Sequence, residues 1–254
     1  MARAPVFDAP GGDGYVYWIA DSHVGDKLSP TAAFATMLRG LEKPRAVVFL
    51  GDLFTVWLAP PKFREPGAQA VLDAFADLRR RGSMVIFVVG NREFFIPPDP
   101  ARARAWGLPC DGVVPGAAVL TWQGRKYGMT HGDLASRKDT PYLRWRFVSR
   151  SRPFEALFRA LPGALARALA RRLERALANT NRAIKITYPE DELRAFAQAV
   201  LPGLDGFLIG HFHRDETLTV TGQKGALRIV PDWHSRKVIV RMDAQHRQET
   251  LDLG

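Results

Sequence analysis

The sequence predicts a mixed α/β protein, and two patterns of apolar residues carry that prediction. In the amino-terminal part of the chain, short apolar runs of strand length alternate with segments of helical periodicity. The order strand, helix, strand, helix, strand is typical of βαβ crossovers and a largely parallel sheet. Toward the carboxyl terminus, alternating apolar and polar residues indicate antiparallel strands. Parallel and antiparallel strand pairs are therefore both expected.

The amino-terminal elements can be placed from local signals. The apolar run at 46–50 is continuous rather than alternating, which indicates a central strand that is covered on both faces. Ser29 and Pro30 form a pair that often starts a helix, and Gly82 is placed to end one. The expected elements are a strand at 15–20, a helix at 31–41, a strand at 46–50, a helix at about 67–81 and a strand at 84–89.

The second half of the chain contains further strand and helix signals. A hairpin is expected at 117–121 and 126–130, because Gln123 and Gly124 separate two strand-like runs. The remaining expected elements are a short helix at 193–201, a strand at 206–209 and antiparallel strands between 217 and 253. No internal repeat or low-complexity linker interrupts the sequence, so we expect a single domain over residues 1–254.

Each of five apolar strands ends in polar side chains that could bind a metal ion. In open α/β sheets, functional groups gather beyond the carboxyl ends of the strands. A pair such as Gly51-Asp52 can also be a simple turn with a capping carboxylate, and a lone histidine is usually structural. Coincidence at five strand ends favours a shared site, whose candidate ligands are Asp21, His23, Asp52, Asn91, His131, His211 and His213.

The chemistry of these side chains restricts the metal. Carboxylate, amide and imidazole groups without thiolate suit divalent ions such as Mn²⁺, Fe²⁺ or Zn²⁺. The single cysteine, Cys110, excludes an internal disulfide and zinc sites built on several cysteines. Seven ligands are too many for one ion, whereas two ions that share one carboxylate would use them all. Asp52, at the end of a central strand, is the expected bridge between them.

Composition bounds the location and the partners. No apolar stretch approaches the roughly 20 residues needed to span a bilayer, and the amino terminus lacks a secretory signal, so we expect a cytoplasmic protein. The formal net charge is +10, and most of it lies between Arg144 and Arg182, where ten arginines face only two glutamates. This local excess of +8 indicates an anionic partner, which could be a phosphate group, a membrane surface or nucleic acid.

The strand-end motifs resemble those of the calcineurin-like metallophosphoesterase family in order and approximate spacing. The matching blocks are Asp21-x-His23, Gly51-Asp52, Gly90-Asn91, His131 and Gly210-His211-x-His213. The resemblance implies a sandwich of two mixed β-sheets flanked by helices. It also implies two metal sites. Carried over by motif, Asp21, His23, Asp52 and His213 hold one ion, and Asp52, Asn91, His131 and His211 hold the other.

The residue after Asn91 limits the kind of bond that the site is expected to cleave. Many members of the family have a histidine there, which protonates a poor leaving group, but this chain has Arg92. An arginine cannot release a proton near neutral pH, yet its planar guanidinium can bind phosphate oxygens. A pyrophosphate, whose leaving group needs no proton, fits this arrangement. Arg92 could alternatively pair with Glu93 or another acid. The expected catalytic residues are Asp52, Asn91, Arg92 and His131.

Several longer blocks resemble the UDP-2,3-diacylglucosamine pyrophosphatases of lipid A biosynthesis. These blocks are Gly51-Asp-Leu-Phe-Thr-Val-Trp57, Gly90-Asn-Arg-Glu-Phe94, His131-Gly-Asp133, Asp139-x-x-Tyr142 and Asp232-Trp-His234. Such enzymes use Mn²⁺ and release UMP and 2,3-diacylglucosamine 1-phosphate. The chain departs from the pattern at Glu93, at Ala59-Pro60-Pro61 and near Ala178. The substrate contacts implied by the resemblance are Asn91, Arg92, Asp139, Tyr142, Arg175 and Lys185.

The basic segment, at about 144–185, has helical periodicity. Leucines recur every four residues from Leu161 to Leu177, and Arg167, Arg171 and Arg175 recur likewise with an offset of two positions. This spacing predicts a helix with a leucine face and an arginine face. The helix could pack on the sheet with its arginines solvated. Alternatively, it could be a lid insert whose apolar interior holds acyl chains while the arginines contact anionic lipid.

The expected protein is thus a monomeric hydrolase that acts on a lipid-linked nucleotide sugar. It would lie peripherally on the cytoplasmic face of an anionic inner membrane. Nucleic acid is not expected as a partner, because leucine and alanine, rather than stacking aromatic residues, separate the arginines. Two other functions stay open. One is a broader-specificity phosphodiesterase of the same superfamily, and the other is a non-catalytic membrane- or protein-binding module with a relic metal site.

Overall fold

Two six-stranded sheets face each other in the computed structural model, which describes residues 4–65, 67–136, 140–172 and 188–254. The first sheet has the order β14 (Gln248–Asp252), β13 (Val238–Met242), β2 (Tyr15–Ile19), β3 (Pro44–Phe49), β5 (Met84–Val88) and β7 (Gly112–Val114). The second has the order β1 (Val6–Asp8), β8 (Ala118–Trp122), β9 (Arg125–Thr130), β10 (Gly206–Ile209), β12 (Ala226–Ile229) and β11 (Glu216–Thr219). A short pair joins β4 (Trp57–Leu58) to β6 (Glu93–Phe94).

Both large sheets are mixed, as the sequence predicts. Strands β2, β3, β5 and β7 are parallel neighbours, whereas β13 runs antiparallel to both β2 and β14. In the second sheet β9, β10 and β12 are parallel, and β8 and β11 pair antiparallel with β9 and β12. The expected two-residue hairpin loop at Gln123 and Gly124 connects β8 to β9. The sandwich of two mixed sheets is therefore confirmed.

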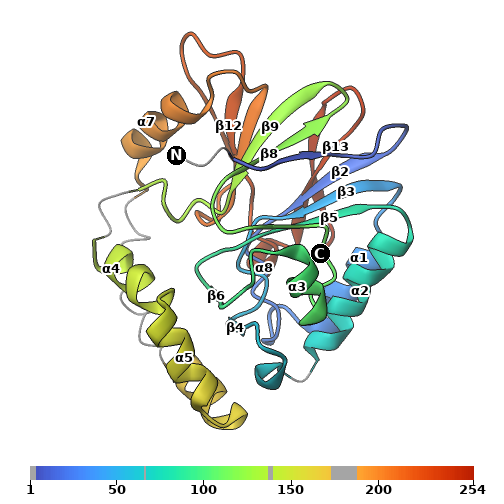
Figure 1. Ribbon diagram of the computed structural model, residues 1–254. Coiled ribbons are helices and arrows are strands. Elements are labelled where there is room, and N and C mark those ends of the chain that lie inside the picture. The colour runs from blue at the N-terminus through green and yellow to red at the C-terminus, as the bar shows by residue number, and fades with distance from the viewer. Residues whose placement is uncertain (1–3, 66, 137–139, 173–187) are drawn as a thin grey trace.

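Helices cover the outer face of each sheet (Figure 1). These helices are α1 (Thr31–Arg39), α2 (Ala68–Arg80), α3 (Pro100–Ala105), α7 (Glu190–Val200) and α8 (Trp233–Arg236). Apolar residues of α1 and α2 pack on the β2–β3–β5 layer, and α7 packs on β10, β11 and β12. Along β2, Tyr17 faces the helices while Trp18 faces the opposite sheet. Because both faces are covered, the central strands are apolar throughout.

Two helix boundaries differ from the sequence-based expectation. Pro30, not Ser29, is the N-cap of α1, and no side chain caps this helix. Helix α7 begins at Glu190, three residues before its expected start. Its first turn contains Glu190, Asp191 and Glu192. Carboxylates near a helix amino terminus stabilise it by interaction with the helix dipole, which accounts for the earlier start.

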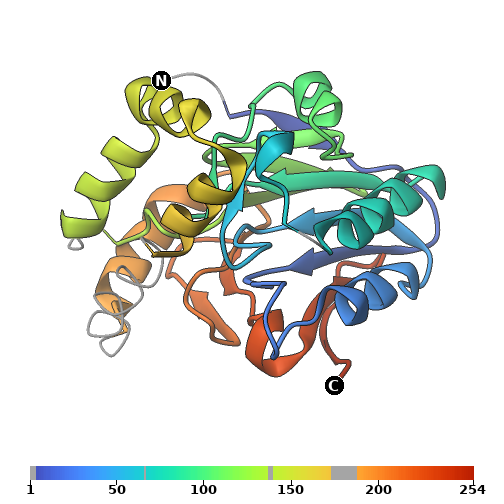
Figure 2. The same ribbon diagram turned by 90° about the horizontal axis from the view of Figure 1, so that it is seen from below.

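A helical segment, defined here as residues 140–172, lies to one side of the sandwich (Figures 1 and 2). It contains α4 (Thr140–Ser149), α5 (Arg152–Ala160) and helical residues at 163–172. The segment begins four residues before the boundary at Arg144 that charge alone suggests. No helix within the described ranges is long and apolar enough to span a bilayer.

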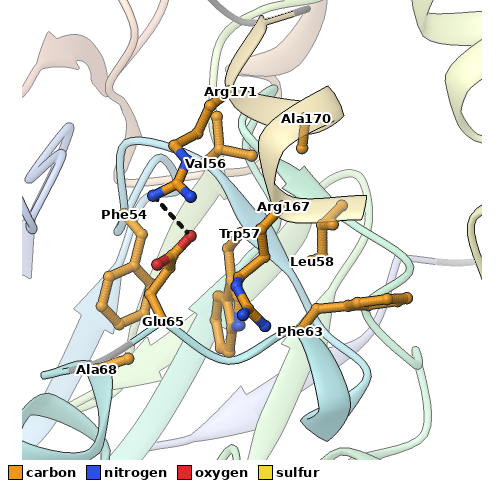
Figure 3. A pocket seen from close by; sticks show the side chains of 10 residues that line it. All are labelled: Phe54, Val56, Trp57, Leu58, Phe63, Glu65, Ala68, Arg167, Ala170 and Arg171. Atoms are coloured by element: carbon orange, nitrogen blue, oxygen red, sulfur yellow. Dashed lines mark ion pairs between the residues drawn. The ribbon is translucent and has the colours of Figure 1, made fainter. Parts of the chain in front are cut away.

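The helix at 163–172 packs differently from its leucine and arginine pattern. Ala166 and Ala170 are buried against the sandwich, whereas Leu165 is 54% exposed. Arg167 donates to the carbonyl of Lys62 at 3.2 Å. In Figure 3 the arginine side chains point toward the body of the protein rather than away from it. The expected arrangement, with leucines inside and arginines outside, holds only in part. Leu169 packs against the buried cluster and Arg171 is 57% exposed, but the small alanines make the closest approach and leave Leu165 outside.

A small cavity lies beneath this helix (Figure 3). Its walls combine aromatic residues near β4 with an ion pair in which Arg171 Nη1 lies 3.4 Å from Glu65 Oε1. Its volume of about 20 Å³ is close to that of a single water site. As it stands, this space is too small for an acyl chain.

Candidate metal centre

Five strand ends from both sheets meet at one place, because the parallel strands point their carboxyl ends in the same direction. Asp21 and Asp52 follow β2 and β3, and Asn91 follows β5. His131 follows β9 of the other sheet, and His211 and His213 follow β10. Backbone hydrogen bonds join these ends within each sheet, and the His211 amide donates to Asp21 Oδ2 at 2.6 Å across the two sheets.

One group of possible metal ligands consists of Asp21, His23 and His213. One ligand atom from each residue lies within 4.8 Å of the other two. The closest of these contacts joins His213 Nε2 to Asp21 Oδ1 at 3.4 Å. Asp21 Oδ1 is buried and has no hydrogen-bond partner among the described residues. An acceptor buried in this way costs free energy unless it is paired, and a divalent cation fits the need.

A second group consists of Asp21, Asp52 and His131, and two further side chains extend it. The Asn91 amide oxygen lies 2.9 Å from His131 Nε2 and 3.2 Å from His211 Nδ1. The two imidazole nitrogens are themselves 3.3 Å apart. His131 Nδ1 lies 2.6 Å from the carbonyl of Leu50, which can only accept a hydrogen bond. Nδ1 must therefore carry the proton, which leaves the Nε2 lone pair for a metal.

Asp52, a member of the second group, also approaches the first. Its Oδ2 is 3.8 Å from His23 Nε2, and its Oδ1 is 3.6 Å from His131 Nε2. Each carboxylate oxygen thus faces a histidine of a different group. Oδ1 also accepts a hydrogen bond from the Arg92 amide at 2.8 Å. The Arg92 side chain approaches the same carboxylate, with Nε 3.8 Å from Oδ2, rather than the alternative partner Glu93.

Five of the candidate ligands have a left-handed backbone. Such a conformation is uncommon for residues other than glycine and typically costs 1–3 kcal/mol. Strain of this kind persists only where the surrounding structure imposes it, and it gathers at functional sites. The residues and their φ angles are Asp21 at 47°, His23 at 40°, Asp52 at 53°, His211 at 71° and His213 at 53°.

Glycine before Asp52 and before Asn91 is a steric requirement. A Cβ atom on Gly51 would lie 2.6 Å from His131 Nδ1. A Cβ atom on Gly90 would lie 2.4 Å from Asp52 Oδ1. Real Cβ atoms essentially never approach backbone or ring atoms so closely, so any other residue would displace the ligands.

The electrostatics of the site favour positive charge. Burial alone would raise the pKa of the Asp21 carboxyl, but His213, and then His131 and His23, hold that pKa below its ordinary value. Burial opposes protonation of His131, yet the carboxylates of Asp52 and Asp21 raise the pKa of this imidazole to about 9. Two buried carboxylates thus attract positive charge from their neighbours. A bound divalent cation would supply this positive charge.

Glu93 is a site residue that the sequence-based site prediction leaves out. It is buried, and its carboxylate accepts three backbone hydrogen bonds, from Gly90 at 2.7 Å, Leu53 at 2.7 Å and Asp52 at 3.0 Å. It thereby joins the end of β3 to the end of β5. Burial, and then the Asp52 carboxylate, raise the pKa of Glu93 to about 8. Its place two residues after Asn91 is the signal that could have identified it.

Asp232 and His234, which follow β12, also contact the candidate ligands. Asp232 Oδ1 lies 3.8 Å from His213 Nδ1, on the side of that ring away from Asp21. The His234 ring packs edge-on against His23 with centroids 5.5 Å apart, and its Nε2 lies 2.8 Å from Asp26 Oδ2. The Asp232-Trp-His234 block is visible in the sequence, but its contact with the metal ligands comes only from the fold.

The structure brings together all seven predicted metal ligands and places Arg92 beside them. Three predicted substrate contacts lie outside the described residues. They are Asp139, Arg175 and Lys185. Tyr142 is described, and its hydroxyl donates to Asp133 Oδ2. A substrate contact by Tyr142 stays a prediction.

Comparison with known proteins agrees with this geometry. The sequence profile of the calcineurin-like phosphoesterase family matches residues 15–215. A UDP-2,3-diacylglucosamine hydrolase from Stenotrophomonas maltophilia is 32% identical over 78% of this chain and 82% of its own length. Enzymes of the same name from Neisseria meningitidis and Aeromonas salmonicida are 31% and 30% identical, over 89% and 93% of this chain and 93% of their own lengths. The chain therefore belongs to the calcineurin-like phosphoesterase family and is a metal-dependent hydrolase.

Proposed function

We propose that the protein hydrolyses the pyrophosphate bond of UDP-2,3-diacylglucosamine to UMP and 2,3-diacylglucosamine 1-phosphate, as a step of lipid A biosynthesis. The relatives that share about 30% of its residues over most of the chain carry the name of this activity. The observation within the structure that supports it best is Arg92, whose backbone is fixed on Asp52 next to Asn91 and His131.

The proposal assigns two divalent ions, with Mn²⁺ preferred and Fe²⁺ or Zn²⁺ as alternatives. One would be held by Asp21, His23, Asp52 and His213, and the other by Asp52, Asn91, His131 and His211. When bound, such a pair lowers the pKa of a water and neutralises phosphoryl charge. The two oxygens of Asp52, which face histidines of different groups, support its role as the bridge.

Arg92 would bind the pyrophosphate. Its side chain is 16% exposed, so it is partly accessible from solvent although Nε is buried. A guanidinium donates hydrogen bonds to phosphate oxygens and stays charged at every physiological pH. It therefore gives no proton to a leaving group. Phosphate is stable as an anion, so a pyrophosphate can be cleaved at this site without a general acid, whereas an alkyl ester would be a poorer substrate.

The helical segment would be the described part of a basic lid at about 144–185, and Asp139, Tyr142, Arg175 and Lys185 would contact the substrate. Its outer surface supports attachment to an anionic membrane on the cytoplasmic face. Phe147 is 82% exposed, Val148 is 49% exposed and Leu157 is 59% exposed. Arg152 and Arg159 are exposed on the same segment. Apolar side chains flanked by arginines are typical of helices that lie in a membrane interface.

Product analysis tests the substrate. Mn²⁺-loaded protein should release UMP from UDP-2,3-diacylglucosamine, and Asp52→Asn should not. No UMP above the level of that variant would refute the proposal. Equal turnover of a soluble phosphodiester and the acylated nucleotide sugar would instead indicate a phosphodiesterase of broader specificity.

A further inference from the structure

The inner face of α4 is polar although its outer face is partly apolar. Tyr142, Arg146 and Arg150 are spaced by four residues and therefore lie on one side of the helix and its last turn. All three are partly buried, whereas Phe147 and Val148 are among the exposed apolar residues. A helix held by apolar packing would show the reverse. Polar contacts therefore contribute to the attachment of α4, together with an edge-on contact between Trp145 and Phe94 of β6, whose ring centroids are 6.5 Å apart.

The first attachment is made to Asp133, which follows His131 by two residues. Asp133 is only 7% exposed. Its Oδ2 accepts hydrogen bonds from the Tyr142 hydroxyl and from Arg146 Nη1, the latter at 2.6 Å. Arg146 Nη1 also lies 3.4 Å from the Tyr142 hydroxyl. One buried carboxylate thus joins two successive turns of α4 to the loop that carries His131.

The second attachment is made to Gly90, the residue before Asn91. Arg150 Nη2 donates to the Gly90 carbonyl at 2.6 Å. The two attachment points are close in space, since His131 Nε2 and the Asn91 amide oxygen are 2.9 Å apart. α4 is therefore connected to both strand ends that supply this pair of candidate ligands.

We propose that Asp133, Tyr142, Arg146 and Arg150 form a latch that positions the helical segment on the metal centre, so that substrate held by the segment meets the strand ends. The four side chains are positioning residues. The role toward substrate rests on the proposed function, whereas the attachment itself does not. Trp145 adds aromatic contacts with Phe94 of β6 and Phe154 of α5, but the latch alone joins α4 to the two loops that carry His131 and Asn91 among the described residues.

Hydrogen exchange tests the attachment without substrate. We expect amides of residues 140–149 to exchange about tenfold faster in Arg146→Ala and in Arg150→Ala than in the unmodified protein. Arg144→Ala is the matched control, since it removes the same charge from an exposed position on the same helix. Arg146→Lys should restore part of the protection. Exchange that is unchanged in both latch variants would overturn the proposal.

Kinetics with two substrates test the positioning role. In the Mn²⁺-loaded latch variants, KM for UDP-2,3-diacylglucosamine should rise about tenfold more than KM for bis(4-nitrophenyl) phosphate, which is too small to need the segment. Equal losses for both substrates would overturn positioning and indicate damage to the metal ligands. If the unmodified protein releases no UMP, the proposed function fails, and hydrogen exchange still decides whether the latch exists.

Discussion

The strand ends and the helical segment are built in opposite ways. At the strand ends, charged side chains are buried, and each is held by backbone hydrogen bonds from a neighbouring strand. In the helical segment, Arg146 and Arg150 contact the body, whereas the large apolar residue Phe147 faces outward. Burial of charged side chains at the strand ends costs free energy, which a bound cation would compensate. Exposure of large apolar side chains on the helical segment is also unfavourable in water, and an apolar partner would cover them.

This contrast separates what each region contributes. The candidate metal centre lies within the sandwich, because all seven candidate ligands follow strands of the two sheets. The helical segment supplies no candidate ligand among the described residues. Its polar contacts near the centre are with Asp133 and Gly90, and its aromatic residues pack on Phe94 and Phe95. Changes at the strand ends should therefore affect every substrate, and changes in the segment should affect only some of them.

The largest effect is expected from His23→Ala. This change removes one candidate ligand and leaves the Asp21 and Asp52 carboxylates with less compensation. Loss of a ligand should exceed the 10–100-fold typical of residues behind the ligands, so we expect more than about 100-fold slower hydrolysis of all substrates. Metal content and initial rates measure the effect. His246→Ala, remote from the centre, is the control, and normal metal content in the His23 variant would contradict the assignment.

Glu93→Gln should come next, with metal affinity reduced about 10–100-fold. Glutamine offers one acceptor oxygen where the carboxylate offers two, and its amide group would face a backbone N–H donor. At least one of the three backbone amides would lose its partner, which costs about 1–3 kcal/mol when the group is buried. Metal titration and the unfolding midpoint measure the two effects. An exposed Glu249→Gln should change neither, and wild-type metal affinity in Glu93→Gln would mean that the Glu93 hydrogen bonds do not position the ligands.

Arg92→Ala should lower kcat/KM for the pyrophosphate substrate by about 10–100-fold, the range expected from a lost charge-assisted hydrogen bond of about 1.5–3 kcal/mol. Metal content should not change, because the backbone amide that donates to Asp52 is kept and the guanidinium contact, with Nε 3.8 Å from Oδ2, is longer than a hydrogen bond. Arg194→Ala on the exposed face of α7 is the control. Lost metal in Arg92→Ala would mean that the guanidinium supports the ligands instead of the substrate.

The sequence predicts the strand ends well for a physical reason. Parallel strands bring their carboxyl ends to one edge whatever their exact packing, so Asp21, Asp52 and His211 can be placed together from order alone. Glu93 could not be placed in this way, since a carboxylate beside a turn can face solvent or protein. Only the register of the β3 and β5 ends shows that it reaches three backbone amides.

The helical segment shows the opposite limit. Leucines and arginines that each recur every four residues predict a helix, but they do not predict which of its faces packs against the protein. The outcome depended on side-chain size, because Ala166 and Ala170 allow close contact and leave Leu165 exposed. The latch was hidden for a similar reason. Arg146 and Arg150 look like further members of a basic stretch until the fold places Asp133 and Gly90 opposite them.

Phe147→Ser should reduce binding to anionic vesicles by about tenfold, since burying a phenylalanine side chain is worth about 1.5–3 kcal/mol. Stability should not fall, because the side chain is 82% exposed. Co-sedimentation with vesicles that contain an anionic phospholipid measures binding. Val6→Ser changes a residue on β1 that is 56% exposed and is the matched control. Equal binding of both variants would mean that the apolar face of α4 does not enter the membrane.

The smallest effect is expected at Cys110, which can show that the two regions respond independently. The thiol is buried in the core between α2, α3 and the first sheet, and burial raises its pKa to about 12. Only about one thiol in ten thousand would then be ionised near pH 8, and thiolate is the reactive form. A thiol-specific reagent should leave Cys110 unmodified in the folded protein and in Phe147→Ser and Arg146→Ala. Rapid modification in Arg146→Ala would mean that loosening the helical segment also opens the sandwich, and the two regions would then have to be treated as one cooperative unit.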